Sequence, residues 1–460
     1  MRPSDNLAMG LLALATEVQQ EIIDYADNIK SIRQVCRQLA DSADRAFLAK
    51  YFTEREHLMT EFGLRALKDI VSNPRLRKNL EKITLWAIDL NRPSWLKESE
   101  HPPARVGSAS NVPPWSGSIK PTATFPQRLA TAWRRWCSGP ASFKGSAEES
   151  ELLSKIFDAL GKCGNDVAIA FKVRHEWFDE PECSAPPLGL RHLERRLELN
   201  LTGREPGSGL LRKMLSMQPK SYDGAAQTIL GAINDTAYPL TALMIQTRAV
   251  TPRLLGSSST TSDQQRARGM SRALQSLQSL TLRHKWSIGY QHIVEAVEEG
   301  EWFENARLLL ASATSLKHLD ADLGYDVWTP VSDKLTIASF MNLVAMSLET
   351  IVLHGADTTA EELLSFLEKH NGSLKSLKLS HIQLEGLQSW EYIIGAVARA
   401  FQLEEVDLRY MLHGNDVLSE PAGDSDVPAR VTVCGSSRAV SAEMMQIASQ
   451  GFHRKDWYEW

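Results

Sequence analysis

The sequence predicts an α/β fold in which a short strand, a turn and a helix recur along much of the chain. Residues 373–382, SLKSLKLSHI, place leucine at 374, 377 and 379 and isoleucine at 382. A helix repeats its apolar positions every three or four residues and a half-buried strand alternates, so neither element alone gives this spacing. The pattern indicates a short strand flanked by turns that also point apolar side chains inward.

The same spacing recurs on both sides of this stretch. LETIVLHGA (residues 348–356) and LEEVDLRYM (403–411) repeat it, so the units follow one another every 26 to 29 residues. Between them lie AEELLSFLEKH and SWEYIIGAVARAF, each apolar on one helical face. Three consecutive units of strand, turn and helix predict a repeated architecture.

Weaker copies lie upstream. LTALMI, LQSLTL and LKHLDA, which begin at residues 240, 277 and 316, keep the first positions of the pattern, and LEKITL, from residue 80, is a distant first copy. The helical segments ELLSKIFDALGKCGN and AAQTILGAIND precede VAIAF and LTALMI. The spacing between these earlier units is longer, so we expect insertions looped out from the repeats.

This pattern resembles the leucine-rich-repeat family, whose strand-containing units recur at roughly this period. The resemblance implies an irregular leucine-rich-repeat solenoid, an arc, over residues 150–418, with a flexible loop at about residues 256–269, where the chain reads GSSSTTSDQQRARG. The alternative is a set of generic βα units in another layered α/β fold.

Alternation along the three best units separates two faces of the predicted strands. Residues 351, 353, 377, 379, 406 and 408 are expected to point into the core, and the residues between them to point outward. A solenoid can bind a protein partner on such an outward strand surface. The candidate binding residues are Val352, His354, Lys378, Ser380, Asp407 and Arg409.

The composition narrows the class of protein. The chain of 460 residues is 43% hydrophobic and carries a net charge of −5, with a pI near 6.2. This charge gives no electrostatic reason to expect binding to nucleic acid or to an anionic membrane. The five cysteines form no disulfide framework, and no uncharged apolar run is long enough to span a bilayer. We therefore expect an intracellular protein, cytoplasmic or nuclear, without a cofactor.

Linkers divide the chain. Residues 91–146 are rich in Pro, Ser and Gly and predict a disordered insertion, although TAWRRWC within it favours a short helix resting on the body of the protein over a docking motif. Residues 51–90 read as connecting helices and the first repeat-like strand. Residues 419–460 read as a linker followed by a strand-like VTVC and a helix that caps the last repeat.

Residues 8–50 predict a small helical domain with more apolar surface than it can bury alone. Thr16 beside Glu17 favours a helix start, because a hydroxyl caps the helix and an acid suits its first turn. Such a domain needs a partner surface. Its apolar positions are Leu14, Val18, Ile22 and Ile23 on the first helix and Val35, Cys36 and Leu39 on the second.

This segment resembles an F-box. The residues that carry the resemblance are Leu14, Glu17, Val18, Ile22 and Ile23 in the first helix and Val35, Cys36, Arg37 and Leu39 at the VCRxL end, with Ala15 at the position of the family's proline. An F-box-like segment followed by a degenerate leucine-rich array is similar to the fungal F-box proteins with irregular C-terminal repeats.

The resemblance implies a non-catalytic substrate receptor of a cullin–RING ubiquitin ligase. In that family the F-box docks on a Skp-type adaptor, and the repeat domain holds a target protein, here of unknown identity, for ubiquitin transfer by another subunit. The alternative is a leucine-rich-repeat scaffold with no ubiquitin-ligase link, in which the helical domain caps the array. The implied adaptor-binding residues are Leu14, Ala15, Val18, Ile22, Ile23, Val35, Cys36 and Leu39.

The sequence lacks the common catalytic motifs. It has no phosphate-binding loop, no G-x-S-x-G elbow and no H-E-x-x-H helix. Cys163, His175, Cys183 and His192 follow one another at spacings that match no usual zinc pattern. We therefore expect neither an enzyme nor a metal site.

Overall fold

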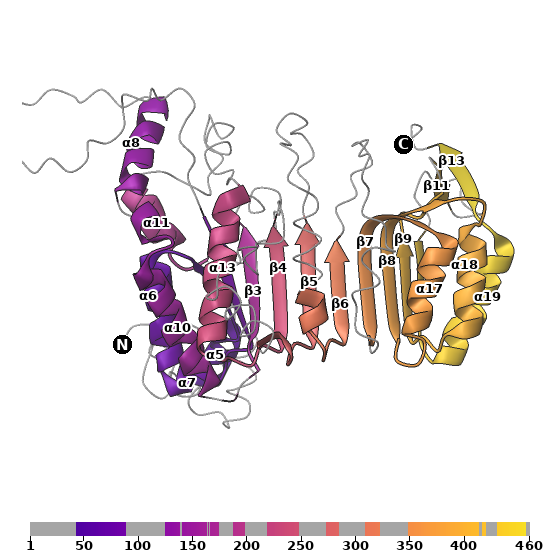
Figure 1. Cartoon of the computed structure of the whole chain (residues 1–460), viewed down its shortest axis with the longest axis horizontal. Helices are drawn as coiled ribbons and strands as arrows, with labels where there is room; N and C mark the ends of the chain where they lie inside the picture. Colours follow the sequence, from indigo (N-terminus) through magenta and orange to yellow (C-terminus); the bar gives the residue numbers. More distant parts are fainter. Residues whose placement is uncertain are drawn as a thin grey trace, which may run out of the picture.

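A computed structural model of the chain describes twelve stretches of it. They form a mixed α/β structure around one open sheet, whose strands lie side by side while helices gather at its two ends (Figure 1). The described residues are 43–88, 125–138, 140–162, 164, 166–173, 187–197, 219–247, 273–284, 309–322, 348–413, 416–419 and 430–456.

Nine strands of the sheet pair in chain order, and every neighbouring pair among them is parallel. Parallel neighbours require a crossover between successive strands, which agrees with the predicted succession of strand and helix. The strands are β1 (Glu54–Leu58), β2 (Lys82–Ala87), β3 (Ala168–Val173), β4 (Ala242–Thr247), β5 (Ser279–His284), β6 (His318–Asp322), β7 (Thr350–Thr359), β8 (Ser376–Glu385) and β9 (Glu405–Arg409).

Four short strands complete the C-terminal end. β12 (Arg430–Cys434) pairs antiparallel with β9, while β10 (Leu412–His413) continues the path of β9 and pairs with β8. β11 (Asp416–Ser419) lies between β10 and β13 (His453–Asp456), antiparallel to both. The last parallel strand is therefore followed by antiparallel strands rather than by another repeat.

Two groups of helices cover the sheet. Among the described residues, α10 packs against α6 and α13 near β1–β4, and α18 packs against α17 and α19 near β7–β9 (Figure 1). The helices are α5 (Asp44–Phe52), α6 (Glu61–Ser72), α7 (Pro74–Arg77), α8 (Phe125–Cys137), α9 (Pro140–Phe143), α10 (Ala147–Gly161), α11 (Leu190–Leu197), α13 (Pro219–Asp235), α17 (Ala360–Lys369), α18 (Trp390–Ala400) and α19 (Ser437–Gln450).

Hydroxyl side chains fix the first turns of three helices. Thr60 and Ser146 each accept a backbone N–H of the following turn, at the starts of α6 and α10. At α17, Thr359 accepts the amide of Glu362 while the Glu362 carboxylate accepts the amide of Thr359, which is a complete capping box. These pairs satisfy amides that no helix bond can reach.

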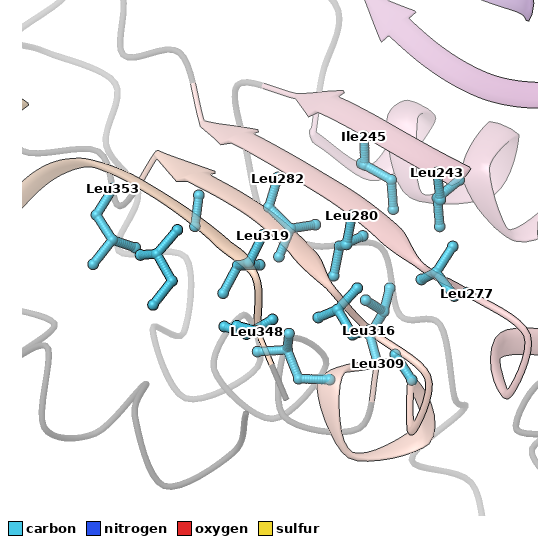
Figure 2. Close-up of a cluster of buried hydrophobic side chains, with 14 of the residues drawn as sticks. Leu243, Ile245, Leu277, Leu280, Leu282, Leu309, Leu316, Leu319, Leu348 and Leu353 are labelled. Carbon is cyan, nitrogen blue, oxygen red and sulfur yellow. The ribbon is translucent and has the colours of Figure 1, made fainter. Parts of the chain in front are cut away.

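A single apolar core runs the length of the sheet. Its strand residues are the leucines of the repeated pattern, which follow one another from strand to strand (Figure 2). The six positions expected to point inward, 351, 353, 377, 379, 406 and 408, are all buried, with at most 2% of their surface exposed. Complete burial of one such side chain stabilises the fold by about 1.5–3 kcal/mol.

A recurring hydrogen-bond pattern accompanies the spacing of three that opens six of the described units. The carbonyl of Glu349 accepts the amides of both Lys375 and Ser376, so the chain departs from strict alternation between Leu374 and Leu377. Six carbonyls do this along the sheet, with N···O distances of 2.7–3.1 Å. They belong to Thr53, Thr241, Gln278, Lys317, Glu349 and Lys375.

A bend in the strand, which we call the corner, explains the spacing of three between the last two apolar positions of the three best units. Gly355, His381 and Tyr410 have φ values of 64°, 54° and 51°, and the strand register places them side by side on β7, on β8 and just after β9. Each residue turns its strand and keeps the pairing, so Ala356 returns to the core after Leu353. Backbone with positive φ is unfavourable for residues other than glycine, so the corner is strained at two of its three positions.

The described elements differ from the predicted domain boundaries in two places. Residues 51–90 contribute two strands to the same sheet as the later strands: β2 lies where the first repeat-like strand was expected, whereas β1 was not expected. Part of segment 91–146, which its composition predicted to be disordered, forms α8 and α9. Trp133 and Trp136 of α8 are buried, which supplies the apolar burial that a Pro- and Ser-rich tract lacks.

Candidate protein-interaction surface

The six candidate binding residues come together on one face of the sheet. Register places them in two adjacent rows across β7, β8 and β9, on the side opposite the leucine core. We call this side, from β6 to β9 and including β12, the open face. The first row is Val352, Lys378 and Asp407, and the second is His354, Ser380 and Arg409.

Both rows continue onto neighbouring strands. Asp320 of β6 and Thr432 of β12 extend the first row at its two ends. Asp322 of β6 and Arg430 of β12 extend the second row in the same way. These four residues were missed by the sequence analysis. The alternation in LKHLDAD could have indicated the two aspartates, whereas an antiparallel strand beside β9 has no signal in a repeat pattern.

Asp407 is the centre of the polar contacts at the C-terminal end of the open face. Arg409 binds both carboxylate oxygens, with its Nε 2.9 Å from Oδ1. Thr432 donates to the same Oδ1 at 3.0 Å, and Arg430 Nε lies 3.6 Å from it. Burial acts to raise the pKa of Asp407, but the hydrogen bonds from Arg409 and Thr432 outweigh it and hold that pKa below its usual value.

A second ion pair lies one register position away. Lys378 Nζ is 2.7 Å from Glu405 Oε1, and Ser376 donates to Oε2 of the same carboxylate at 2.7 Å. These two hydrogen bonds lower the pKa of Glu405. Because both charged side chains are more than a third exposed, this pair contributes little stability. It leaves a lysine and a carboxylate accessible to a partner.

His354 links the second row to β6. Its Nδ1 shares a hydrogen bond with the Ser380 hydroxyl, and its Nε2 lies 3.8 Å from Asp320 Oδ1. The neighbouring His381 stacks on Tyr410, with ring centroids 4.3 Å apart and planes at 14°. Burial lowers the pKa of His381, and the nearby His354 adds to this effect.

The line from Ser380 through His354 to Asp320 has the residue types of a nucleophile, a base and an orienting carboxylate. Two hollows that the described residues line lie elsewhere: one is bordered by α6 and α10, and the other by α6, α9 and α11. A reacting carbonyl group needs a binding site beside the hydroxyl. On the open face these three side chains offer polar groups that a partner can contact.

Exposure differs sharply within the six candidates. Arg409 is 43% exposed at its side chain, and Lys378 and His354 are 37% and 36% exposed. In contrast, Ser380 and Asp407 are buried, which corrects the expectation that alternation alone makes an outward residue available. Their hydrogen bonds to His354 and Arg409 place larger side chains around them.

The same side of the sheet is closed near β2 and β3. Thr84 and Trp86 of β2 and Ala170 of β3 occupy the register positions of the two rows, yet each is at most 2% exposed. β2 is thus buried on both faces, in keeping with the largely apolar run ITLWA, whereas Lys172 of β3 is partly exposed. The accessible polar part of this side lies toward the C-terminal strands.

Other predicted residues fall outside this surface. The eight adaptor-binding residues of the F-box-like segment lie outside the described residues, as do Cys163, His175 and Cys183. His192 stacks on Phe62, with centroids 4.3 Å apart. Within the described ranges, no group of three or more His, Cys, Asp or Glu side chains is placed to hold a metal ion, and no helix is both long and apolar enough to cross a membrane.

Comparison with known proteins supplies no further assignment. No protein-family model matches the chain, and a search of curated proteins finds no similar sequence. The function is therefore inferred from the geometry of the open face and from the sequence resemblances.

Proposed function

We propose that this chain is a non-catalytic substrate-recognition subunit of a cullin–RING ubiquitin ligase of the Skp-adaptor type. Its repeated units would form an irregular leucine-rich-repeat domain that binds a target protein on the open face. Its F-box-like segment, residues 8–50, would dock on the adaptor. The protein would act inside the cell, where these partners are found.

The observation that carries the proposal is the open face itself. Among the described residues, β6 to β9 and β12 present paired rows of charged and hydroxyl side chains. An extended polar surface supported by a rigid sheet suits recognition of a protein, which is also the role that the resemblance implies. Guanidinium groups such as that of Arg409 are frequent in such interfaces.

The repeat geometry supports the leucine-rich-repeat part of the proposal. Six of the described units begin where one carbonyl of the preceding strand region accepts two amides, and the three best units end at a shared corner. These two features reproduce the leucine spacing that resembles the family. A regular family member carries Asn or Cys beyond the corner, whereas this chain has Ala356, Ile382 and Met411 there, all buried.

Capture by a purified Skp-type adaptor tests the adaptor link. The full-length parent is expected to be retained on immobilised adaptor, and a variant with Val18→Asp and Ile22→Asp is expected to be lost. Two unpaired carboxylates in an apolar interface cost several kcal/mol, enough to abolish a micromolar complex. Leu387→Asp is the control for an added carboxylate, because Leu387 is fully exposed and its replacement adds one of the two charges at a site outside the proposed interface.

The same experiment distinguishes the scaffold alternative. Circular dichroism and thermal unfolding establish that each variant is folded. If the folded parent is not captured, the adaptor link is wrong and a protein-binding scaffold remains. If the parent and the Val18→Asp, Ile22→Asp variant are captured equally, the interface is not the predicted helical face.

A further inference from the structure

The outermost strands at the two ends of the sheet, β1 and β12, differ in whether another segment pairs with their outer edge. At β1, Leu188 pairs with the strand from outside: its amide donates to Glu56 O at 2.8 Å, and its carbonyl accepts the amide of Leu58 at 3.0 Å. At the other end, β12 pairs with β9 and with no other strand of the described residues. One edge is therefore paired in part by Leu188, whereas the outer side of β12 carries no strand among the described residues.

Register fixes which backbone groups of β12 face outward. Glu405 donates its amide to the carbonyl of Lys375, just before β8, so the backbone groups of the alternate residues Val406 and Leu408 are directed toward β12. Their partners on β12 are Val433 and Val431. It follows that the N–H and C=O groups directed away from β9 belong to Arg430, Thr432 and Cys434. All three residues are exposed.

This edge carries little of the protection that edge strands usually have. β12 reads RVTVC, two β-branched valines and a threonine with no proline or lysine. Beyond the corner, β10 continues the path of β9 and pairs with β11. β11 in turn pairs with β13. Past the corner, β13 thus pairs with the outer edge of β11. Before the corner, no described strand pairs with the outer edge of β12.

The charges at this edge favour an anion. Arg409 and Arg430 both lie on Asp407, so two guanidinium groups share one carboxylate. Arg430 is 54% exposed, and only its Nε takes part in the contacts made within the described residues, with Thr432 at 3.0 Å and Asp407 at 3.6 Å. Its two terminal nitrogens can therefore bind a carboxylate of a partner.

We propose that the open edge of β12 binds an extended acidic segment of a partner protein, which adds a strand to the sheet and places a carboxylate on Arg430. Main-chain hydrogen bonds would come from Arg430, Thr432 and Cys434, and Arg430 would select an acidic side chain on the open face. This deepens the proposed function by giving the target's binding mode, and it rests on that function only in calling the partner a target.

Fluorescence polarisation of a labelled peptide with the full-length chain tests this proposal without any adaptor. The probe alternates glutamate and valine between terminal glycines, and a second probe has lysine in place of glutamate. The chain is expected to bind the acidic probe saturably and at least tenfold more tightly than the basic one. Methylating the backbone nitrogens of the acidic probe is expected to abolish binding, because strand addition needs its amide donors.

Two substitutions separate the backbone from the charge. Cys434→Pro removes an outward amide that β9 does not use, so it is expected to weaken binding at least tenfold while the melting temperature stays close to that of the parent. Arg430→Glu is expected to remove the preference for the acidic probe. Arg191→Glu, at an exposed position on α11, is the matched charge control and is expected to bind like the parent.

Three results would overturn the proposal. The first is that the folded parent does not bind the acidic probe saturably. The second is that folded Cys434→Pro binds the probe as tightly as the parent. The third is that sedimentation shows a dimer of the chain and that Cys434→Pro dissociates it. The last result would make a second copy of the chain the occupant of the edge. The peptide-binding and sedimentation measurements involve no adaptor, so a failure of adaptor capture would not change their results. Each of the two proposals can therefore be contradicted without the other.

Discussion

At the scale of single residues, His57 of β1 shows how a polar side chain is accommodated in the core. It is fully buried, and its Nδ1 lies 3.1 Å from the carbonyl of Gly63 in α6. Because that carbonyl can only accept, Nδ1 carries the proton of a neutral imidazole. Burial lowers the pKa of His57 from 6.5 to about 3, and the charge of Arg55 acts in the same direction.

This pKa predicts a loss of stability in acid. Between pH 6.5 and about 3 the unfolded chain binds a proton at His57 and the folded chain does not, so the free energy of unfolding falls with the pH. The loss is about 2 kcal/mol at pH 5 and is absent above pH 7. His57→Asn keeps an N–H donor for Gly63, so its free energy of unfolding should fall by about 2 kcal/mol less between pH 7 and pH 5.

Urea unfolding of both proteins at the two pH values measures this difference. His318→Asn is the matched control, since it removes an imidazole at an exposed position. An unchanged pH dependence in folded His57→Asn would mean that His57 does not contribute to acid sensitivity.

At the scale of elements, α6 is held against β1 by a close approach of backbone to backbone. A Cβ atom on Gly63 would lie 2.2 Å from the carbonyl oxygen of Leu58, which no side-chain rotation can relieve. Gly63→Ala is therefore expected to destabilise the fold by about 1–3 kcal/mol. Gly231→Ala in α13, where a Cβ meets nothing within 4 Å, is the control and should be neutral or stabilising. Equal melting temperatures for the two variants would contradict the described packing of α6.

The shared strand corner gives a second prediction for an element. Gly355 has a φ of 64°, so Gly355→Val is expected to lower the free energy of unfolding by about 1–2 kcal/mol. His381 has a φ of 54°, which glycine tolerates better than histidine. In His381→Gly the relief of this strain should therefore partly offset the stability lost with the stacking on Tyr410. Chemical denaturation measures both effects. A Gly355→Val protein as stable as the parent would contradict the positive φ.

The repeated elements could be predicted from the sequence because each depends on local periodicity. The leucine spacing placed β7, β8 and β9 and the helices α17 and α18 between them, and the buried residues agree with the expected inward positions. β1 was missed because EREHL shows no apolar alternation, and its buried His57 is polar. The corner could not be foreseen at Tyr410, since tyrosine seldom adopts positive φ, and a single histidine at 381 is a weak signal although that residue type is enriched there.

The candidate site was predictable in part for the same reason. Alternation identified the face that carries Lys378 and Arg409, but burial of Asp407 depends on Arg409 and on Thr432 from β12, a strand that pairs antiparallel from beyond the repeats. A contact of that kind depends on tertiary structure, which a one-dimensional pattern does not contain. The F-box-like residues lie outside the described residues, so their role remains a prediction.

At the scale of the whole molecule, the proposed receptor needs two separate surfaces. The F-box-like segment would bind the adaptor, and the open face of β6–β9 and β12 would bind the target. Reversing charges on the open face should therefore leave adaptor binding intact. Lys378→Glu with Arg409→Glu is suited to this, because both side chains are more than a third exposed and neither belongs to the core.

The most direct test of this account is to compare protein ubiquitination in cells that produce the parent, the Val18→Asp, Ile22→Asp variant or the Lys378→Glu, Arg409→Glu variant. Each variant is first tested for adaptor capture and for folding. The account predicts that at least one protein is ubiquitinated with the parent and not with either variant, although only the first variant loses the adaptor. The same ubiquitination pattern with all three would contradict the claim that this chain is a substrate receptor.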